Sequence, residues 1–418
     1  MSGRRLAALA LACVLALAAR VAPASEPTVL LISFDGTPPA AAAELATFQR
    51  IARDGAWADA LVPAFPSNTF PNHVTFVTGV APDRHGIVNN VFRDPARGRF
   101  DYAADPAWLE SEPLWSIAAR AGVVSAAYHW VGSEGVWTSG LGPRHWEPFD
   151  AAVPEARKVE RILAWLDLAD PAERPRLVTA WFHGADGAAH RMGPDAPAVA
   201  ASLARQDADL AALLSGLEQR GLLATTTLVV VSDHGMARVR STVDLGEVLG
   251  DANADAEVLG GGGFATVALH GERDRDARAA RAVAAARALG LEAWRRGEGP
   301  PAYASANARF GDVVVVAPLG VQISSRTYAE RLLGRIGVGA PEMRGVHGHR
   351  PELPEMAGLF AAIGRGVAPG ARVGTVRAAD VAPTVLALLG IPIPAHMEGR
   401  PIPLDAAPQS DARSPSAP

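Results

Sequence analysis

The sequence predicts an α/β protein built on a doubly wound, mostly parallel β-sheet. Short β-rich runs alternate with helical stretches along the chain, which is the order of elements in a parallel sheet covered by helices. Residues 228–231 read LVVV, and continuous apolar strands of this kind are typical of a sheet buried on both faces. The chain has 418 residues, 49% of them hydrophobic, so it can build a large core within one α/β domain with insertions.

The individual elements follow from β-rich runs and from the helical spacing of apolar residues. We expect strands at Thr28–Ser33, Gly122–Ala127, Arg176–Phe182, Thr226–Ser232 and Asp312–Ala317. We expect helices at Ala40–Arg53, Arg157–Leu168 and Ala198–Arg220. Residues 251–309 follow the alternation least well, because they hold a run of glycines at 260–263 and a helical stretch rich in Arg and Ala. We therefore expect a small inserted subdomain there.

Both ends of the chain are expected to lie outside the folded unit, which we place at residues 25–405. Residues 1–24 have a charged start, a short apolar run and the small-residue sequence APA at 22–24, which together indicate a secretory signal peptide. The expected location is therefore periplasmic or secreted, without a stable membrane anchor. A membrane anchor is the alternative, although the apolar run is short for a bilayer. Residues 406–418 are rich in Ala, Ser and Pro and are predicted to be disordered.

Charge and cysteine content limit the partners. The net charge is −5 and no basic patch dominates, which argues against a nucleic-acid polymer as a partner. The only cysteine, Cys13, lies in the leader, so the mature chain would contain no disulfide; lipidation at that cysteine is a minor alternative. The only lysine, Lys158, is expected on a surface helix. The oligomeric state stays open.

Acidic and imidazole side chains follow three of the expected strands. Asp35 comes after the first strand, Asp186 after the strand that ends at Phe182, and the pair Asp233 and His234 after the strand that ends at Ser232. The carboxyl ends of strands in open α/β sheets form the edge where ligands bind. A single Asp after a strand is more often a helix cap, so the set as a whole carries the prediction of a metal site.

Two further features extend this candidate metal site. Asp186 and His190 are four residues apart, which places them on one face of a helical turn. His347 lies in the segment GVHGH at 345–349, where glycines allow a close backbone approach; His349 is the alternative ligand in this segment. A mixed set of carboxylates and imidazoles suits zinc better than magnesium or calcium, which prefer oxygen ligands.

Thr69 is the expected nucleophile. It lies in the segment FPSNTFPNH at 65–73, before a helical-looking stretch, and the start of a helix favours anions. A bound metal can lower the pKa of a threonine hydroxyl, so no histidine base is required. Two metals about 4 Å apart can hold both the attacking and the leaving oxygen of an in-line phosphoryl transfer. Ser67 is the competing nucleophile.

The ordered motifs resemble the nucleotide pyrophosphatase/phosphodiesterase family of the alkaline phosphatase superfamily. The resemblance covers residues 28–402, nearly the whole expected mature chain, and its order is far more specific than any single motif. The matching segments are LISFDG at 31–36, FPSNTFPNH at 65–73, HGIVNN at 85–90, WVGSE at 130–134, DGAAHRMGP at 186–194, SDHGM at 232–236, GVHG at 345–348 and DVAPT at 380–384. This resemblance implies an alkaline-phosphatase-like fold.

The resemblance also implies two zinc ions per chain. One would be held by Asp35, Asp233, His234 and the oxygen of Thr69, and the other by Asp186, His190 and His347. Asn90 matches the family asparagine that donates a hydrogen bond to a phosphoryl oxygen, which stabilises charge, and Phe70 matches the position that stacks against a substrate base or leaving group. The implied reaction is attack of Thr69 on the phosphorus of a small phosphodiester or nucleotide, followed by hydrolysis of the phospho-threonine.

Several alternatives remain open at this level. The family often has two acidic residues before the aspartate that matches Asp186, whereas this chain has FHGA at 182–185. A phosphate monoesterase generally needs an added cation near the site, and a phospholipid headgroup phosphodiesterase is a second rival. A sulfatase is disfavoured because no arginine follows in the nucleophile segment. A non-catalytic zinc scaffold is disfavoured because every ligand position, Thr69 and Asn90 are present.

Overall fold

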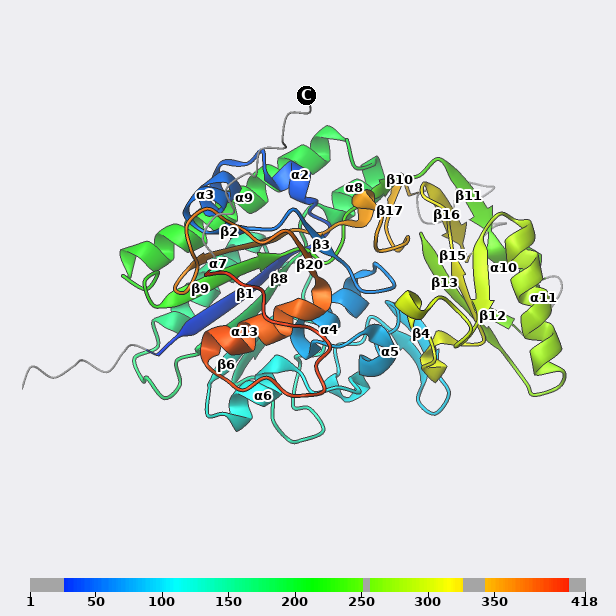
Figure 1. The fold of residues 1–418 in the computed structure, drawn as a ribbon, viewed down its shortest axis with the longest axis horizontal. Coiled ribbons are helices and arrows are strands. Elements are labelled where there is room, and N and C mark those ends of the chain that lie inside the picture. Colours follow the sequence, from blue (N-terminus) through cyan, green and yellow to red (C-terminus); the bar gives the residue numbers. More distant parts are fainter. Residues whose placement is uncertain (1–25, 251–255, 326–342, 406–418) are drawn as a thin grey trace, which may run out of the picture.

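The computed structural model describes residues 26–250, 256–325 and 343–405 (Figure 1). The predicted signal peptide at 1–24, with Cys13, and the predicted tail at 406–418 lie outside the described residues. The described residues form a large α/β part around an eight-stranded sheet and a separate four-stranded sheet. We call the second part, residues 256–316, the small lobe.

The centre of the main sheet is parallel. β1 (Thr28–Phe34) pairs with β8 (Leu177–Phe182) on one side and with β9 (Thr226–Val231) on the other. Ser33 lies opposite Trp181 of β8 and Val231 of β9, so the carboxyl ends of the three strands finish at the same level. This common edge positions the candidate site.

Shorter strands extend the main sheet on both sides. The full order is β19-β2-β18-β9-β1-β8-β6-β7, in which β18 runs antiparallel to β9 and the pairs β8–β6 and β6–β7 are parallel. The predicted fold class, a mostly parallel α/β sheet, is confirmed. The flanking strands are β6 (Ser125–Tyr128), β7 (His145–Glu147), β18 (Phe360–Gly364), β2 (Ala56–Trp57) and β19 (Ala371–Arg372).

Helices cover both faces of this sheet (Figure 1). Successive residues of β1 point to opposite faces, so Val29 and Leu31 join one core while Leu30 and Ile32 join the other. The first core is covered by α4 (Thr69–Thr78), α6 (Leu114–Arg120) and α13 (Val381–Leu389). The second is covered by α3 (Ala46–Asp54), α7 (Glu155–Leu166) and α9 (Pro197–Gln219).

The helix expected at 40–53 is divided in two. It forms α2 (Pro39–Ala42) and α3, because Leu45 adopts an extended conformation with φ −96° and ψ 141° that ends one helix and begins the next. Three further helices are α5 (Pro82–His85), α8 (Asp186–Met192) and α10 (Leu245–Gly250). Short 3₁₀ turns lie at Pro106–Trp108, Pro301–Tyr303, Ala308–Phe310, Pro354–Met356 and Ala378–Asp380.

The small lobe contains an antiparallel sheet in the order β12-β13-β15-β14, with α11 packed against it. The strand expected at Asp312–Ala317 forms β15 in this sheet and is not part of the main one, because it pairs with β13 and β14. The lobe has a core of its own, which includes Val267, Ala282 and Val315. Its elements are β12 (Ala256–Gly261), β13 (Phe264–Leu269), α11 (Arg275–Ala288), β14 (Glu292–Arg295) and β15 (Val313–Val316).

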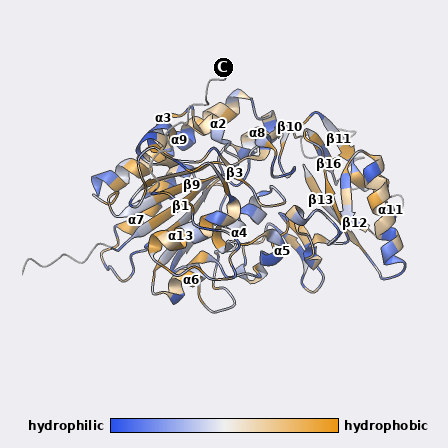
Figure 2. Cartoon of the chain, viewed as in Figure 1, coloured by the Kyte–Doolittle hydropathy of each residue, from blue (hydrophilic) through white to orange (hydrophobic). Residues whose placement is uncertain are grey.

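The described residues also form four two-stranded pairs. Figure 2 shows hydrophobic residues along the strands of the main sheet and hydrophilic residues on the outer side of α11. Within the described ranges, no helix is both long and apolar enough to cross a membrane. The pairs are β3 (Ala60–Val62) with β20 (Thr375–Arg377), β4 (Val91–Asp94) with β5 (Gly98–Asp101), β10 (Ala237–Arg238) with β17 (Gly345–Val346), and β11 (Ser241–Asp244) with β16 (Val321–Ser324).

Candidate metal centre and nucleophile

One group of possible metal ligands follows two central strands directly. Asp35 is the residue after β1, and Asp233 and His234 come just after β9. The Nε2 atom of His234 lies 3.6 Å from Oδ1 of Asp35 and 3.2 Å from Oδ2 of Asp233. All three residues are buried, with exposed fractions of 3%, 0% and 0%. We call this group the Asp35 set.

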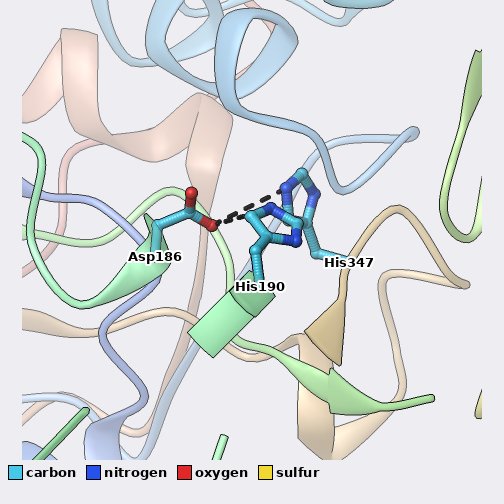
Figure 3. Close-up of side chains that lie close together, drawn as sticks. All are labelled: Asp186, His190 and His347. Atoms are coloured by element: carbon cyan, nitrogen blue, oxygen red, sulfur yellow. Dashed lines mark ion pairs between the residues drawn. The ribbon is translucent and has the colours of Figure 1, made fainter. Parts of the chain in front are cut away.

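A second group combines a helical turn with a loop. Asp186 and His190 lie one turn apart in α8, and His347 follows β17. Oδ1 of Asp186 lies 3.2 Å from Nε2 of His190 and 3.8 Å from Nε2 of His347, as Figure 3 shows. Asp186 and His190 are about a fifth exposed, at 20% and 21% of their side-chain surface. We call this group the Asp186 set.

The two sets adjoin each other. The imidazole rings of His234 and His347, one from each set, stack with their centroids 3.6 Å apart and an interplanar angle of 17°. In each set, the possible ligand atoms lie within 4.8 Å of one another. The predicted division of the six residues into two groups of three is therefore the division that the fold produces.

The carboxylates of both sets fit bound cations. Oδ1 of Asp35, Oδ1 of Asp186 and Oδ2 of Asp233 are buried and have no hydrogen-bond partner. These same oxygens face the histidine Nε2 atoms. Leaving a buried charge without a partner is costly, and burial, together with the charges of Asp233 and Asp186, raises the pKa of Asp35 well above its usual range. A cation would offset both penalties.

The surrounding hydrogen bonds orient the same atoms. Nε1 of Trp181 donates to Oδ2 of Asp35 at 3.0 Å, and the backbone N–H of Gly36 donates to Oδ1 of Asp233 at 3.1 Å. These bonds occupy one oxygen of each carboxylate and leave the other directed into the set. Outer hydrogen bonds of this kind fix the orientation of metal ligands.

The histidines are held in the tautomer that a metal requires. The Nδ1 atom of His234 donates to the carbonyl of Gly235 at 2.9 Å, and that of His190 donates to the carbonyl of Gly345 at 2.8 Å. Nδ1 of His347 lies 2.9 Å from Oδ1 of the Asn68 side chain. A donor at Nδ1 leaves the lone pair at Nε2 free for a metal, so all three imidazoles present their Nε2 atoms to the sets.

Thr69 lies at the Asp35 set. It is the first residue of α4, and its Oγ1 lies 3.2 Å from Nε2 of His234. The competing nucleophile, Ser67, is turned away, because its Oγ donates to the carbonyl of His349 at 2.8 Å. His349 itself faces the carbonyl of Ala317 through Nδ1 at 3.1 Å. Of these alternatives, the fold brings Thr69 and His347 to the metal sets.

Asn90 lies beside the start of the nucleophile helix. Its Oδ1 accepts a hydrogen bond from the backbone N–H of Phe70 at 2.9 Å, which leaves the amide Nδ2 as a donor. The Phe70 ring is only 6% exposed, because it packs edge-to-face against Tyr102 and Trp181 with centroids 5.1 and 6.3 Å away. A substrate ring at Phe70 would therefore also meet Tyr102, which is 57% exposed.

Sequence reasoning did not find the aromatic residues around the site. Trp181, whose indole bonds to Asp35, stacks on Phe149 with centroids 5.4 Å apart and an interplanar angle of 22°. Phe149 is 46% exposed and lies in a loop without periodicity. Trp181 could have been predicted from the sequence, because it is the second-last residue of the expected strand that ends before Asp186 and so lies close to the edge of the sheet where the candidate ligands gather.

Lys158 was expected on a surface helix, and that helix, α7, does have an exposed face, but Lys158 lies on the buried face. Its side chain is fully buried, and its Nζ donates to the carbonyl of Trp181 at 2.8 Å and lies 3.1 Å from Oε2 of Glu155. Lys158 is buried because it lies one turn before the buried Ile162, on the face of α7 that packs against the sheet. Among the described residues, the ion pairs of the Asp35, Asp186 and Asp233 carboxylates are all with histidines. The Lys158 ammonium contacts Trp181 and Glu155 instead.

The fold and these two sets define an α/β protein with a candidate two-metal site at the carboxyl edge of a parallel sheet. Residues 29–350 match the model of the type I phosphodiesterase / nucleotide pyrophosphatase family. The chain belongs to this family, as the resemblance predicted.

The relatives match over part of their length. The chain is 39% identical over 184 residues to an uncharacterized pyrophosphatase/phosphodiesterase of Schizosaccharomyces pombe, covering 42% of this chain and 38% of that protein. It is 31% identical over 214 residues to human ectonucleotide pyrophosphatase/phosphodiesterase family member 1, covering 50% and 23%. The chain thus spans well under half the length of these curated relatives.

A solved structure matches over more of the chain. Murine ectonucleotide pyrophosphatase/phosphodiesterase 5 superposes with a TM-score of 0.77 at 25% identity, covering 88% of this chain and 96% of that one. An inactive threonine-to-alanine variant of the murine protein, in complex with AMP, gives a TM-score of 0.79 at 24% identity, covering 88% and 96%. The second likeness shows the fold alone.

Proposed function

We propose that this chain is a zinc-dependent phosphodiesterase/nucleotide pyrophosphatase that acts through a phospho-threonine on Thr69. The observation that carries the proposal is the contact of the Thr69 hydroxyl with His234, 3.2 Å away, at the junction of two adjacent metal-ligand sets. Family membership supports the reaction class. The six ligands, Thr69, Asn90 and Phe70 keep the roles that the sequence predicted for them.

The chain's own residues account for most of the reaction geometry. Thr69 begins a ten-residue helix, where the dipole and free N–H groups favour a phosphoryl oxygen. The Asn90 side chain is oriented because its Oδ1 accepts from the backbone N–H of Phe70. Its Nδ2, which also contacts the Tyr102 hydroxyl, carries two N–H donors, so one can bind a second phosphoryl oxygen. A preorganised donor of this kind stabilises the charge that develops in the transition state. The Thr69 oxygen attacks phosphorus, the alcohol or phosphate leaves, and water cleaves the phospho-threonine.

Two zinc ions suit the donor atoms. Each set offers carboxylate oxygens and imidazole nitrogens within 4.8 Å of one another, the ligand types that zinc prefers. Bound zinc would lower the pKa of the threonine hydroxyl and stabilise negative charge on the oxygens. Asp35, Asp233, His234 and Thr69 would hold one ion, and Asp186, His190 and His347 the other.

The substrate that fits best is a small phosphodiester or nucleotide. Membership of the type I phosphodiesterase / nucleotide pyrophosphatase family supports a nucleotide-class substrate. We place the catalytic unit at residues 25–405 and its location outside the cytoplasm, after cleavage of the predicted signal peptide.

The substrate preference is tested with four compounds. Purified, zinc-loaded protein is assayed with bis-p-nitrophenyl phosphate, p-nitrophenyl phosphate, the nitrophenyl ester of a nucleoside monophosphate and a choline phospholipid analogue. We expect the nucleotide ester to turn over fastest. A monoester rate well above both diester rates would instead identify a phosphate monoesterase, and a preference for the phospholipid analogue a headgroup phosphodiesterase.

The nucleophile is tested by Thr69→Ala. We expect turnover to fall to background while the protein still binds two zinc ions, because the six Asp and His ligands are unchanged. Thr69→Ser is the matched control, since it restores a hydroxyl at the same place and should retain part of the activity. Retention of most activity by Thr69→Ala would show that another group attacks phosphorus.

A further inference from the structure

The glycine run at 260–263 contacts the candidate site from the small lobe. Gly260 and Gly261 end β12, and Gly262 and Gly263 form the turn to β13; we call all four residues the glycine turn. The backbone N–H of Gly263 donates to the carbonyl of the candidate ligand His347 at 2.7 Å. A Cβ atom at Gly263 would lie 2.4 Å from the backbone N of His349 and 2.6 Å from the carbonyl carbon of Gly348. The turn and the His347 loop are therefore packed too closely for any side chain at this position.

The same turn contacts the asparagines beside the nucleophile. A Cβ atom at Gly260 would lie 2.4 Å from Nδ2 of Asn89, a residue that is only 2% exposed. Oδ1 of Asn89 accepts hydrogen bonds from the Asn68 side chain and from the backbone N–H of Asn90, each at 2.8 Å. Asn68 directly precedes Thr69, so Gly260 packs against the residue that joins the Thr69 and Asn90 segments.

Asn68 connects these two contacts. Its side-chain nitrogen donates to Asn89, and its side-chain oxygen accepts from Nδ1 of His347 at 2.9 Å. The glycine turn touches both ends of this chain of hydrogen bonds, at Asn89 and at His347. Displacement of the turn would therefore move the Asn90 segment or the His347 loop.

A second residue next to the small-lobe sheet anchors the Asn90 segment. Arg309 is 4% exposed, and its Nε bonds to Oδ2 of Asp94 while its Nη1 donates to the carbonyls of Gly86 and Trp108, at 2.7, 3.0 and 2.7 Å. Gly86 and Asp94 lie on either side of Asn90. The guanidinium thus holds both ends of the segment that presents the Asn90 amide.

We propose that Gly260 and Gly263 are positioning residues of the active site, through which the small lobe fixes His347 and the Asn68–Asn89–Asn90 network. Gly263 acts on the Asp186 set through His347, and Gly260 acts on Thr69 and Asn90 through Asn89. The proposal rests on the proposed function for its kinetic readouts. Its metal readout is independent of which substrate the protein cleaves.

The first test compares Gly263→Ala with Gly261→Ala. Gly261 belongs to the same turn, but a Cβ there meets only the carbonyl of Ile323, at 3.2 Å. Because the Gly263 variant must push on the His347 loop, we expect it to release one of its two zinc ions to a chromophoric chelator about 10-fold faster, in the range found for residues that orient metal ligands. Gly261→Ala should match the wild type. Equal release by both variants and the wild type would overturn the role of Gly263.

The second test compares Gly260→Ala with Gly271→Ala. Both glycines have positive φ, +90° and +72°, but nothing lies within 4 Å of a Cβ at Gly271, so the control carries the backbone strain without the clash. We expect Gly260→Ala to lower kcat by about 10-fold or more with KM and zinc content unchanged, because the Asn90 donor is worth about 10²- to 10³-fold in sites of this type. An unchanged kcat, or an equal loss in Gly271→Ala, would overturn the role of Gly260.

A third pair covers the case in which a glycine variant does not fold. Arg309→Lys keeps the charge but cannot bond Asp94 and two carbonyls together, and Arg275→Lys alters an ion pair within the small lobe, where Nε lies 2.7 Å from Oδ1 of Asp312. We expect a lower kcat with retained zinc only in Arg309→Lys. An equal kcat in the two variants would contradict positioning by the small lobe.

If the wild type cleaves no phosphate ester, the proposed function fails. Zinc release by the Gly263→Ala variant would still decide whether Gly263 positions His347.

Discussion

The two metal-ligand sets differ in how the chain builds them. The Asp35 set comes from residues at the ends of two central strands, and its members are at most 3% exposed. The Asp186 set comes from a helical turn and a loop, and Asp186 and His190 are about a fifth exposed. Strand ends are fixed by the pairing of β1 with β9, whereas His347 depends on contacts with the glycine turn.

In the reaction proposed above, this difference gives the two sets different tasks. The buried set contacts the Thr69 hydroxyl, and its rigidity suits a group that holds the proposed nucleophile in one place. Partial exposure of the other set suits binding and release of the proposed leaving group. We therefore expect damage to the buried set to be more severe.

The largest expected effect distinguishes Asp233→Asn from His190→Asn. Asp233 is fully buried, so solvent cannot enter to take over from the lost carboxylate ligand, and we expect turnover and one zinc ion to be lost even in excess zinc. His190 is partly exposed, so water can take its place, and excess zinc should restore part of the turnover. Zinc content and rates are measured at several zinc concentrations. Equal rescue of the two variants would contradict the comparison.

A smaller effect is expected from Trp181→Phe. This change removes the 3.0 Å hydrogen bond from the indole to Asp35, and loss of such an outer partner typically costs about 10- to 100-fold in metal affinity or activity. Trp294→Phe is the control, since its indole bonds to Ser305 in the small lobe at 3.2 Å. Zinc affinity is measured by chelator competition. The idea is wrong if both variants bind zinc as tightly as the wild type.

The smallest effect concerns stability outside both sets. Burial lowers the pKa of His85 to about 3, and its Nδ1 accepts from the N–H of Ile87 at 3.2 Å. The unfolded chain therefore takes up a proton first as pH falls below about 6.5, and the free energy of unfolding decreases by about 2 kcal/mol by pH 5. His85→Gln should show a shallower decrease in urea unfolding between pH 7 and 5. An identical slope would mean that other groups carry the acid sensitivity.

The sequence was sufficient to predict the central strands and the candidate ligand residues that the fold brings together, because these depend on local pattern and chain order. The strands β1, β8 and β9 follow from continuous apolar runs. The predicted ligands lie together because four of them follow strands and the other two, Asp186 and His190, lie one turn apart in α8. The division into two sets came from family order, since adjacent residues such as Asp233 and His234 do not by themselves reveal which ion they share.

The features that the sequence did not predict depend on tertiary contacts. Lys158 has a charged side chain on an amphipathic helix, and only the nearby Trp181 carbonyl and Glu155 explain its burial. Residues 312–317 have the composition of a core strand, but pairing with β13 and β14 places them in the small lobe. The glycine run likewise gave no sign of its contact with His347.

The burial of Lys158 has a practical consequence for covalent labelling. It is the only lysine in the sequence, burial lowers its pKa, and its ammonium is enclosed by Trp181 and Glu155. An amine-reactive dye should therefore mark only the terminal amine of the folded chain and gain a second attachment point when α7 separates from the sheet. Mass spectrometry of the labelled protein would then follow the opening of one chosen helix without the introduction of any probe.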